Sequence, residues 1–224
     1  MEPILDPTVF VIESPSLDDI RDGRSEGEAL CAALRLAEIT SDYYRVKDVK
    51  TLGECFASIC KTTKSRQQRG DRKVLAIPHL HFSAHGNENG LALTNGEFVP
   101  WDGLRIMLLA LGKATGYVGP SGYCLFLTTF STCDGAFASR MFFGDPPREF
   151  STKMFAGGPP KPCIGIVGPA EKVSWSDSLT AFVTFYHLNL TKHIPAQQAV
   201  KIMNEAAGLT DVFRCYAHDQ GESP

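Results

Sequence analysis

Short apolar runs alternate with longer amphipathic segments along this chain. Runs of roughly four to eight β-branched and aromatic residues, bounded by turn residues, are typical of strands buried on both faces. Strands that alternate with helical segments favour a parallel sheet with helices on both faces. The predicted strands are residues 8–12, 43–46, 74–84, 123–131, 164–167 and 212–216.

Helices are predicted between these strands from capping signals and apolar spacing. The pattern S/T-x-x-E occurs twice, at Ser25 with Glu28 and at Thr51 with Glu54, and each pair indicates a helix N-terminus. Further helices are predicted at 104–111 ending at Gly112, at 136–143, at 179–190, and between Pro195 and Gly208.

A small hairpin is predicted beside the end of the third strand. Residues 91–93 and 98–99 are apolar and flank an Asn95-Gly96 pair, the strongest short-range hairpin signal. The expected fold is therefore α/β and three-layered, with a mostly parallel six-stranded sheet, helices on both faces and a hairpin near His85.

Composition narrows the class of protein. The 224 residues suit one domain, 1–224, and 43% hydrophobic with 21% charged residues is ordinary for a globular protein. The net charge of −3 gives no reason to expect a nucleic-acid partner. The N-terminus lacks the features of a signal peptide, and no apolar run approaches the roughly 20 residues of a membrane span. We therefore expect a cytoplasmic protein without a membrane partner, whose seven cysteines are reduced thiols.

One cysteine and one histidine stand where predicted strands end. Cys133 follows strand 123–131, and His85 follows strand 74–84. If these strands are parallel neighbours, both side chains emerge at the carboxyl edge, where open α/β sheets place their ligands. A thiol attacks as the thiolate, and a nearby imidazole can activate it by accepting its proton. The N–H groups of Gly86 and Cys133 would form an oxyanion hole, so the pattern predicts acyl transfer on a peptide bond.

Two motifs resemble a known family. His85-Gly86 after an apolar strand, and Ser131-Thr132-Cys133-Asp134 after the next one, resemble the His-Gly and Cys motifs of caspase-like cysteine peptidases (clan CD), which include caspases, metacaspases and separases. The chain is most similar to the CHAT family within this group. Residues 163–206 resemble the CHAT pattern of a strand, a Trp-containing loop, a helix and a P-A-x-A helix, and Thr132 replaces the commoner alanine before the nucleophile.

The resemblance implies a cysteine endopeptidase with a His85–Cys133 dyad and no metal or other cofactor. It also implies a substrate cleft bordered by the loop around Trp175, and a charged pocket for the residue before the scissile bond. Asp134 and Asp177 are candidates for that pocket, which would favour cleavage after a basic residue. For Asp134 the alternative is an acid that stabilises a helix N-terminus, and for Trp175 it is packing in the core or in a lid.

The resemblance also implies a biological setting. Related proteins are often effectors, switched on by a ligand or a partner protein, in antiviral defence or cell-death systems. Here such a partner would act in trans on an enzyme that cuts a protein substrate. The Pro- and Gly-rich segment 143–162, with Arg148, Lys153 and Lys161, is a candidate for self-cleavage or for ordering on activation.

Three other interpretations remain open. Cys133 and His85 taken singly are also consistent with a buried thiol and a core histidine. His79, His81 and His85 alternate on one strand face and could bind zinc, although no fourth ligand is evident. A catalytically silent caspase-like module for binding or regulation would have the same fold, because function depends on the site.

Overall fold

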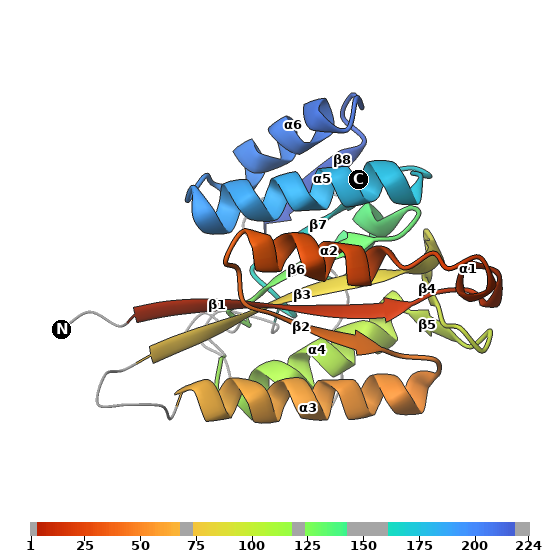
Figure 1. Ribbon diagram of the computed structural model, residues 1–224. Helices are drawn as coiled ribbons and strands as arrows, with labels where there is room; N and C mark the ends of the chain where they lie inside the picture. The colour runs from red at the N-terminus through yellow and green to blue at the C-terminus, as the bar shows by residue number, and fades with distance from the viewer. Residues whose placement is uncertain (1–3, 68–73, 118–123, 143–160, 218–224) are drawn as a thin grey trace.

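The computed structural model describes residues 4–67, 74–117, 124–142 and 161–217. Their strands belong to one mixed, mostly parallel sheet with helices on both faces (Figure 1). Six strands lie in the order β2-β1-β3-β6-β7-β8, and β8 is antiparallel to β7. This confirms the predicted α/β class and all six predicted strands, which are β1 (Ile4–Ser14), β2 (Ser41–Arg45), β3 (Val74–Asn87), β6 (Leu127–Ser131), β7 (Gly165–Pro169) and β8 (Phe213–Ala217).

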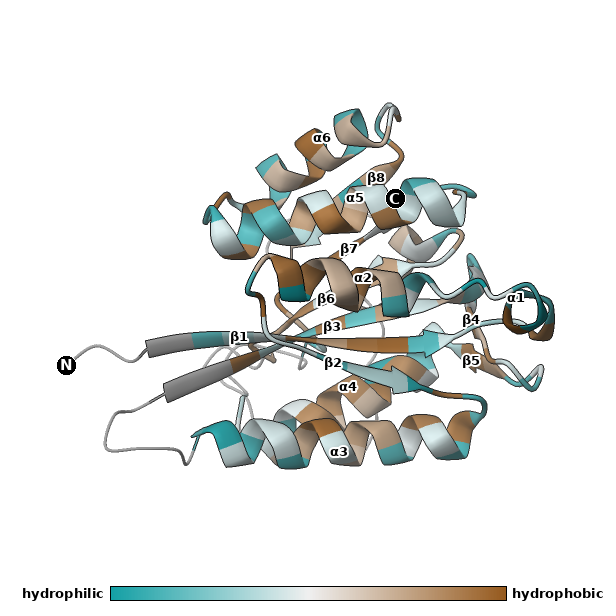
Figure 2. Cartoon of the chain, viewed as in Figure 1, coloured by the Kyte–Doolittle hydropathy of each residue, from teal (hydrophilic) through white to brown (hydrophobic). Residues whose placement is uncertain are grey.

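The central strands are continuous apolar runs because both of their faces are covered. In β1, Phe10 and Ile12 point into one apolar cluster, whereas Val9 and Val11 point into another. In Figure 2 the middle of β1 is coloured as hydrophobic and lies between helices. The sheet therefore separates two hydrophobic cores.

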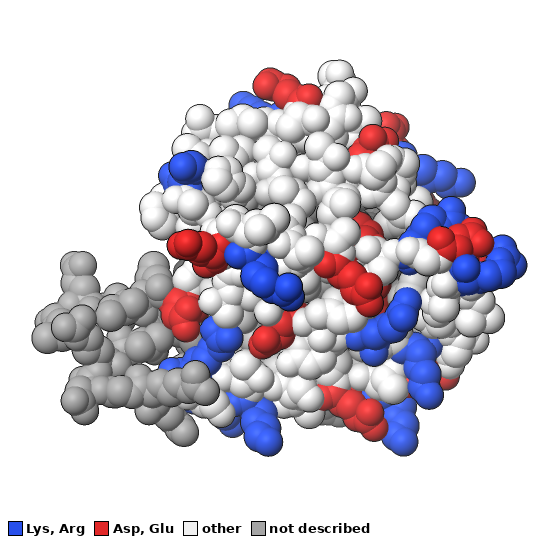
Figure 3. Space-filling model, viewed as in Figure 1, with Lys and Arg blue, Asp and Glu red and all other residues white. Residues whose placement is uncertain are grey.

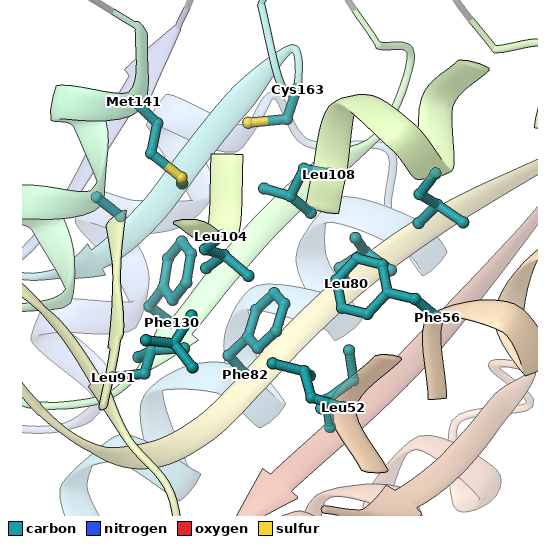
Figure 4. Close-up of a cluster of buried hydrophobic side chains, with 14 of the residues drawn as sticks. Leu52, Phe56, Leu80, Phe82, Leu91, Leu104, Leu108, Phe130, Met141 and Cys163 are labelled. Atoms are coloured by element: carbon teal, nitrogen blue, oxygen red, sulfur yellow. The ribbon is translucent and has the colours of Figure 1, made fainter. Parts of the chain in front are cut away.

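Among the described residues, two α-helices cover one face of the sheet and three cover the other (Figure 1). On the first face, Phe82 of β3 stacks on Phe130 of β6, with ring centroids 5.2 Å apart, and Leu104 packs beside them (Figure 4). The helices of this face are α3 (Val49–Gln67) and α4 (Trp101–Thr115), and those of the opposite face are α2 (Glu26–Leu36), α5 (Trp175–Tyr186) and α6 (Ala196–Ala206).

The predicted hairpin is present and extends the strand that carries His85. Strands β4 (Gly90–Ala92) and β5 (Phe98–Pro100) pair with each other, and β4 pairs with the end of β3. Gly96 has a φ of +88°, which only glycine adopts easily, and this explains the Asn-Gly signal.

Some predicted helix ends are wrong, for identifiable reasons. Ser25 caps α2 as predicted. Thr51 does not cap α3, because Asp48 lies three residues earlier and its carboxylate accepts the N–H of Thr51. An aspartate at the N-cap is among the most favourable residues, so the helix begins at Val49.

Gly112 does not end α4, which continues to Thr115 and stops at Gly116, with a φ of +75°. A Cβ at position 112 would lie 2.1 Å from Sγ of Cys124, so Gly112 permits close packing rather than a turn. The predicted helix 136–143 is the 3-10 helix η1 (Gly135–Phe142).

Helix α5 begins at Trp175, four residues before its predicted start, because Ser174 caps it. It ends at Tyr186, and a π-helical turn, η3 (His187–Thr191), follows it. A short helix that the sequence did not predict, α1 (Leu17–Arg21), follows β1 at the carboxyl edge of the sheet (Figure 1).

The surface carries charges of both signs. On the face shown in Figure 3, basic and acidic side chains are interspersed. Within the described part of the chain, every helix is too short or too polar to cross a membrane.

Candidate active site

His85 and Cys133 emerge together at the carboxyl edge of the sheet. Strands β3 and β6 are parallel neighbours, and Ser83 is paired with Ser131 at the end of their ladder. His85 and Cys133 each lie two residues beyond these serines, so the two strands bring them to the same level. Both side chains line one small pocket, together with Ala84, Ser131, Thr132, Val173, Trp175 and Ser178.

Cys133 lies in a tight turn between β6 and η1. The turn is closed by a hydrogen bond from the N–H of Gly135 to the carbonyl of Thr132. Asp134 has a φ of +60°, a conformation that aspartate tolerates better than most residues. Gly135 is required because a Cβ there would lie 2.7 Å from Cβ of Phe130. The turn presents Cys133 half-buried at the pocket.

Four of the other cysteines are buried, whereas Cys133 is half-buried. Burial raises the pKa of Cys55 and Cys124 to about 12, and it also raises the pKa of Cys31 and Cys163. These thiols stay protonated near neutral pH and are poor nucleophiles.

Gly86 brings two main-chain segments close together. A Cβ on Gly86 would lie 2.3 Å from Oγ1 of Thr132, 2.8 Å from the carbonyl oxygen of Gly90 and 3.5 Å from that of Cys133. Only glycine fits this position. The structure therefore brings together the two residues whose N–H groups were predicted to form the oxyanion hole.

A third polar residue, Asp19 of α1, contacts the histidine. Its Oδ2 lies 2.6 Å from Nε2 of His85, and its side chain is 5% exposed. The hydroxyl and N–H of Ser16 also donate to Oδ2, and the guanidinium of Arg24 lies 3.2 Å from Oδ1. Burial acts to raise the pKa of Asp19, but the hydrogen bonds from Ser16 and His85 outweigh it and lower this pKa to about 2. Asp19 is therefore a carboxylate at neutral pH.

This contact fixes the state of the imidazole. A carboxylate can only accept hydrogen bonds, so Nε2 of His85 must carry the hydrogen. In the neutral ring the basic nitrogen is then Nδ1. Trp175 meets the His85 ring edge to face, with centroids 5.4 Å apart, and limits its rotation.

Asp19 was not predicted as a site residue, although the sequence contains a signal for it. Ser16 and Asp19 have the spacing of a capping box, and both reciprocal hydrogen bonds are formed in α1. The box directly follows β1, which lies next to β3 in the sheet. The same argument that placed His85 at the carboxyl edge therefore applies to Asp19.

The three candidate substrate-binding residues lie in different places. Trp175 lies in the first turn of α5 rather than in a loop, and it lines the pocket of Cys133. The Asp177 carboxylate accepts a hydrogen bond from Ser174 in the cap of α5. Asp134 lies in the turn before η1. Among the described residues, neither aspartate lines the pocket that holds His85 and Cys133.

His79 and His81, which were considered as zinc ligands together with His85, have surroundings that do not resemble a metal site. Nδ1 of His81 lies 2.9 Å from Oγ1 of Thr129, and the His81 ring lies edge-on to Phe182. Burial lowers the pKa of His79 to about 4. Within the ranges that the structure describes, no group of three or more His, Cys, Asp or Glu residues is arranged to hold a metal ion.

Comparisons with known proteins give no independent assignment. No protein-family model matches the chain, and no curated protein matches it.

Proposed function

We propose that this protein is a caspase-like cysteine endopeptidase in which Cys133 is the nucleophile and His85 is the general base. The observation that carries the proposal is the arrangement at the sheet edge, where the thiol and the imidazole line one pocket and Asp19 holds Nε2 of the imidazole. Nucleophile, base and a group that orients the base are the parts that nucleophilic acyl transfer requires.

The proposed reaction begins with proton transfer from Sγ of Cys133 to Nδ1 of His85. The thiolate attacks the carbonyl carbon of the substrate, and the N–H groups of Gly86 and Cys133 stabilise the resulting oxyanion. The C–N bond breaks as His85 returns the proton to the leaving amine, which leaves a thioester on Cys133. Water, deprotonated by His85, then hydrolyses the thioester and restores the thiol.

Asp19 contributes as a positioning residue. It touches neither the thiol nor the substrate carbonyl in this scheme, but it keeps the hydrogen on Nε2 and stabilises the imidazolium that forms during each proton transfer.

The wider role that we propose comes from the motifs. It is that of an effector, activated by a ligand or a partner protein in trans, that cleaves a protein substrate after a basic residue in a defence or cell-death pathway. The cytoplasm is the proposed location. The self-cleavage hypothesis concerns a segment that lies outside the described residues, apart from its last two positions.

A peptidyl acyloxymethyl ketone with arginine or lysine at the cleavage position tests the proposal. We expect it to form a thioether on Cys133 of the purified chain, detected by mass spectrometry. Labelling should be absent in Cys133→Ala and at least about a hundredfold slower in His85→Ala. Cys60→Ala is the control, because Cys60 is partly exposed on α3 and should not matter.

Unchanged labelling of the His85→Ala variant would contradict the proposed dyad. If Cys133→Ala retained the full biological effect of the wild-type chain, the catalytically silent module would be the better description.

A further inference from the structure

Strand β8 forms one edge of the sheet. Among the described residues it pairs only with β7, and helix α6 lies beside it at the end of the sheet opposite to β2 (Figure 1). A groove of about 920 Å³ lies between α6 and β8. Pockets for small molecules usually have roughly 300–1,000 Å³, so this groove has room for several residues of a peptide.

The ladder between β7 and β8 determines which main-chain groups of β8 point outward. In an antiparallel pair, residues that bond to the neighbouring strand alternate with residues whose N–H and C=O point away from it. The N–H of Ala170 donates to the carbonyl of Val212, so the even-numbered residues of this segment bond to β7. The N–H and C=O groups of Phe213, Cys215 and Ala217 therefore point towards the open edge.

The first of these three residues is already bonded by a side chain. The amide of Asn204, on α6, accepts the N–H of Phe213 at 2.8 Å and donates to its carbonyl at 2.9 Å. An amide bonded in this way takes the place of a neighbouring strand. The N–H and C=O of Cys215 have no such partner in the part of the chain that the structure describes. The open edge therefore begins at Cys215 and continues at Ala217.

The wall of the groove that α6 forms is polar and carries a cation. Gln197, Lys201 and Asn204 line the groove, and their spacing of four and three residues places them on one face of the helix. Lys201 is exposed and has no ion pair among the described residues. From β8, Arg214 also lines the groove and lies 3.7 Å from Asp211. Two cations against one carboxylate make the groove suitable for an acidic ligand.

We propose that this groove binds an extended acidic peptide segment of a partner protein, which adds to β8 as a further strand. Its main chain bonds to the N–H and C=O of Cys215, and an acidic side chain pairs with Lys201. Addition of a peptide to an open sheet edge is a recurring mode of recognition, in which main-chain bonds supply affinity and side-chain contacts supply specificity. This binding is independent of the chemistry proposed at Cys133.

A second copy of the chain is a less suitable partner for the groove. In a two-fold interface the same patch meets itself. The cations Lys201 and Arg214 would be brought towards their counterparts, and like charges on paired strands are destabilising. The open edge is also short, because Asn204 closes it at Phe213.

Peptide binding by the purified chain is the first test. The probe is a fluorescein-labelled peptide of alternating valine and glutamate, whose glutamates share one face of an extended strand. We expect saturable binding, followed by fluorescence anisotropy. A peptide with lysine in place of glutamate should bind at least about tenfold more weakly. A version with every main-chain nitrogen methylated keeps its charges but cannot donate main-chain hydrogen bonds, and it should also bind at least about tenfold more weakly.

Two variants of the chain locate the site. Cys215→Pro removes an N–H that lies outside the ladder, which an edge strand tolerates, and it should weaken binding of the glutamate peptide about threefold to tenfold. Lys201→Glu reverses a charge on the groove wall, so the lysine peptide should now bind better than the glutamate peptide. Lys192→Glu is the matched control, because Lys192 is exposed and lies outside the groove.

Lys201→Glu also guards against a folding defect in Cys215→Pro, because replacing an exposed side chain rarely disturbs a fold. A further readout does not depend on any variant. Hydrogen exchange, measured by mass spectrometry, should slow at residues 213–217 when the glutamate peptide is bound to the wild-type chain, because the outward N–H groups gain partners.

Four results would overturn the proposal. Lack of saturable binding of the glutamate peptide would exclude the ligand class, and equal binding of the methylated peptide would leave charge attraction alone. An unchanged preference for the glutamate peptide in Lys201→Glu would place the binding elsewhere. A dimer, seen by sedimentation, that Cys215→Pro dissociates would make the groove an interface between copies. None of these measurements requires a reactive thiol at Cys133, so they leave the peptidase proposal to its own test.

Discussion

At the scale of single residues, the contact between Asp19 and His85 has the largest consequences. The Asp19 carboxylate is buried, whereas the His85 ring is 46% exposed. The better-held carboxylate therefore sets the orientation of the ring. The rate of thiol attack should therefore depend on a residue that does not touch the substrate carbonyl.

Asp19→Asn tests this dependence. The amide keeps the size of the side chain but can donate to Nε2, which favours the wrong tautomer. We expect the maximal labelling rate of Cys133 with the peptidyl acyloxymethyl ketone to fall roughly tenfold to a thousandfold, with the half-saturating concentration unchanged. Asp18→Asn is the control, because Asp18 is 72% exposed and pairs with Arg21. An unchanged rate in Asp19→Asn would remove Asp19 from the mechanism.

The same carboxylate predicts a pH dependence of stability. Its pKa is about 2 in the folded chain and has an ordinary value of 3.8, so it contributes stability above about pH 4 that is lost as the pH falls towards 2. The contribution is about 2 kcal/mol. Urea unfolding at a series of pH values should show that the free energy of unfolding falls less steeply with acid for Asp19→Asn than for the wild-type chain. Parallel curves for the two proteins would contradict the pKa assignment.

At the scale of elements, the sequence predicted strands better than helix ends. A strand buried on both faces, such as β1, has an unbroken apolar run, which is a pattern that few other secondary-structure elements show. Helix ends depend on competing polar side chains, and Asp48 outcompeted Thr51 in α3. Helix α1, with five residues, is too short for any periodic signal, so its Asp19 was missed.

Gly112 shows how packing reverses an element-scale preference. Alanine is ordinarily better than glycine inside a helix by about 1 kcal/mol. In Gly112→Ala the new Cβ would meet Sγ of Cys124, so we expect a net loss of about 1–3 kcal/mol in the free energy of unfolding.

Gly53→Ala in α3 is the matched comparison, because a Cβ there meets nothing within 4 Å, and it should raise stability by about 1 kcal/mol. Urea unfolding of both variants measures the difference. A stabilising Gly112→Ala would show that α4 and Cys124 can move apart.

At the scale of the whole molecule, the site exists only when the sheet is assembled. Asp19 and Cys133 follow β1 and β6, His85 lies near the end of β3 between these strands, and Trp175 comes from a helix on one face. Strand order could not be predicted from local patterns, because it depends on contacts between segments far apart in the chain. The meeting of His85 and Cys133 in one pocket was predictable because each residue stands at the end of a predicted strand.

Phe130→Ala tests how strongly the core supports this assembly. Phe130 is fully buried, stacks on Phe82 and meets Trp101 edge to face. We expect a loss of about 3–5 kcal/mol in the free energy of unfolding. Phe98→Ala, at a residue 42% exposed in β5, should cost under about 1 kcal/mol. Similar losses in both variants, by urea unfolding, would contradict the burial described for β6.

The fit around Gly86 limits how this site can evolve. One of the atoms that exclude a side chain there, Oγ1 of Thr132, would disappear if that threonine became alanine, but the carbonyl of Gly90 belongs to the main chain and would remain. Any substitution of Gly86 is therefore unfavourable, whatever residue occupies position 132. Thr132, in contrast, can be substituted while Gly86 is kept. Descendants of this sequence should drift at the threonine and stay fixed at the glycine.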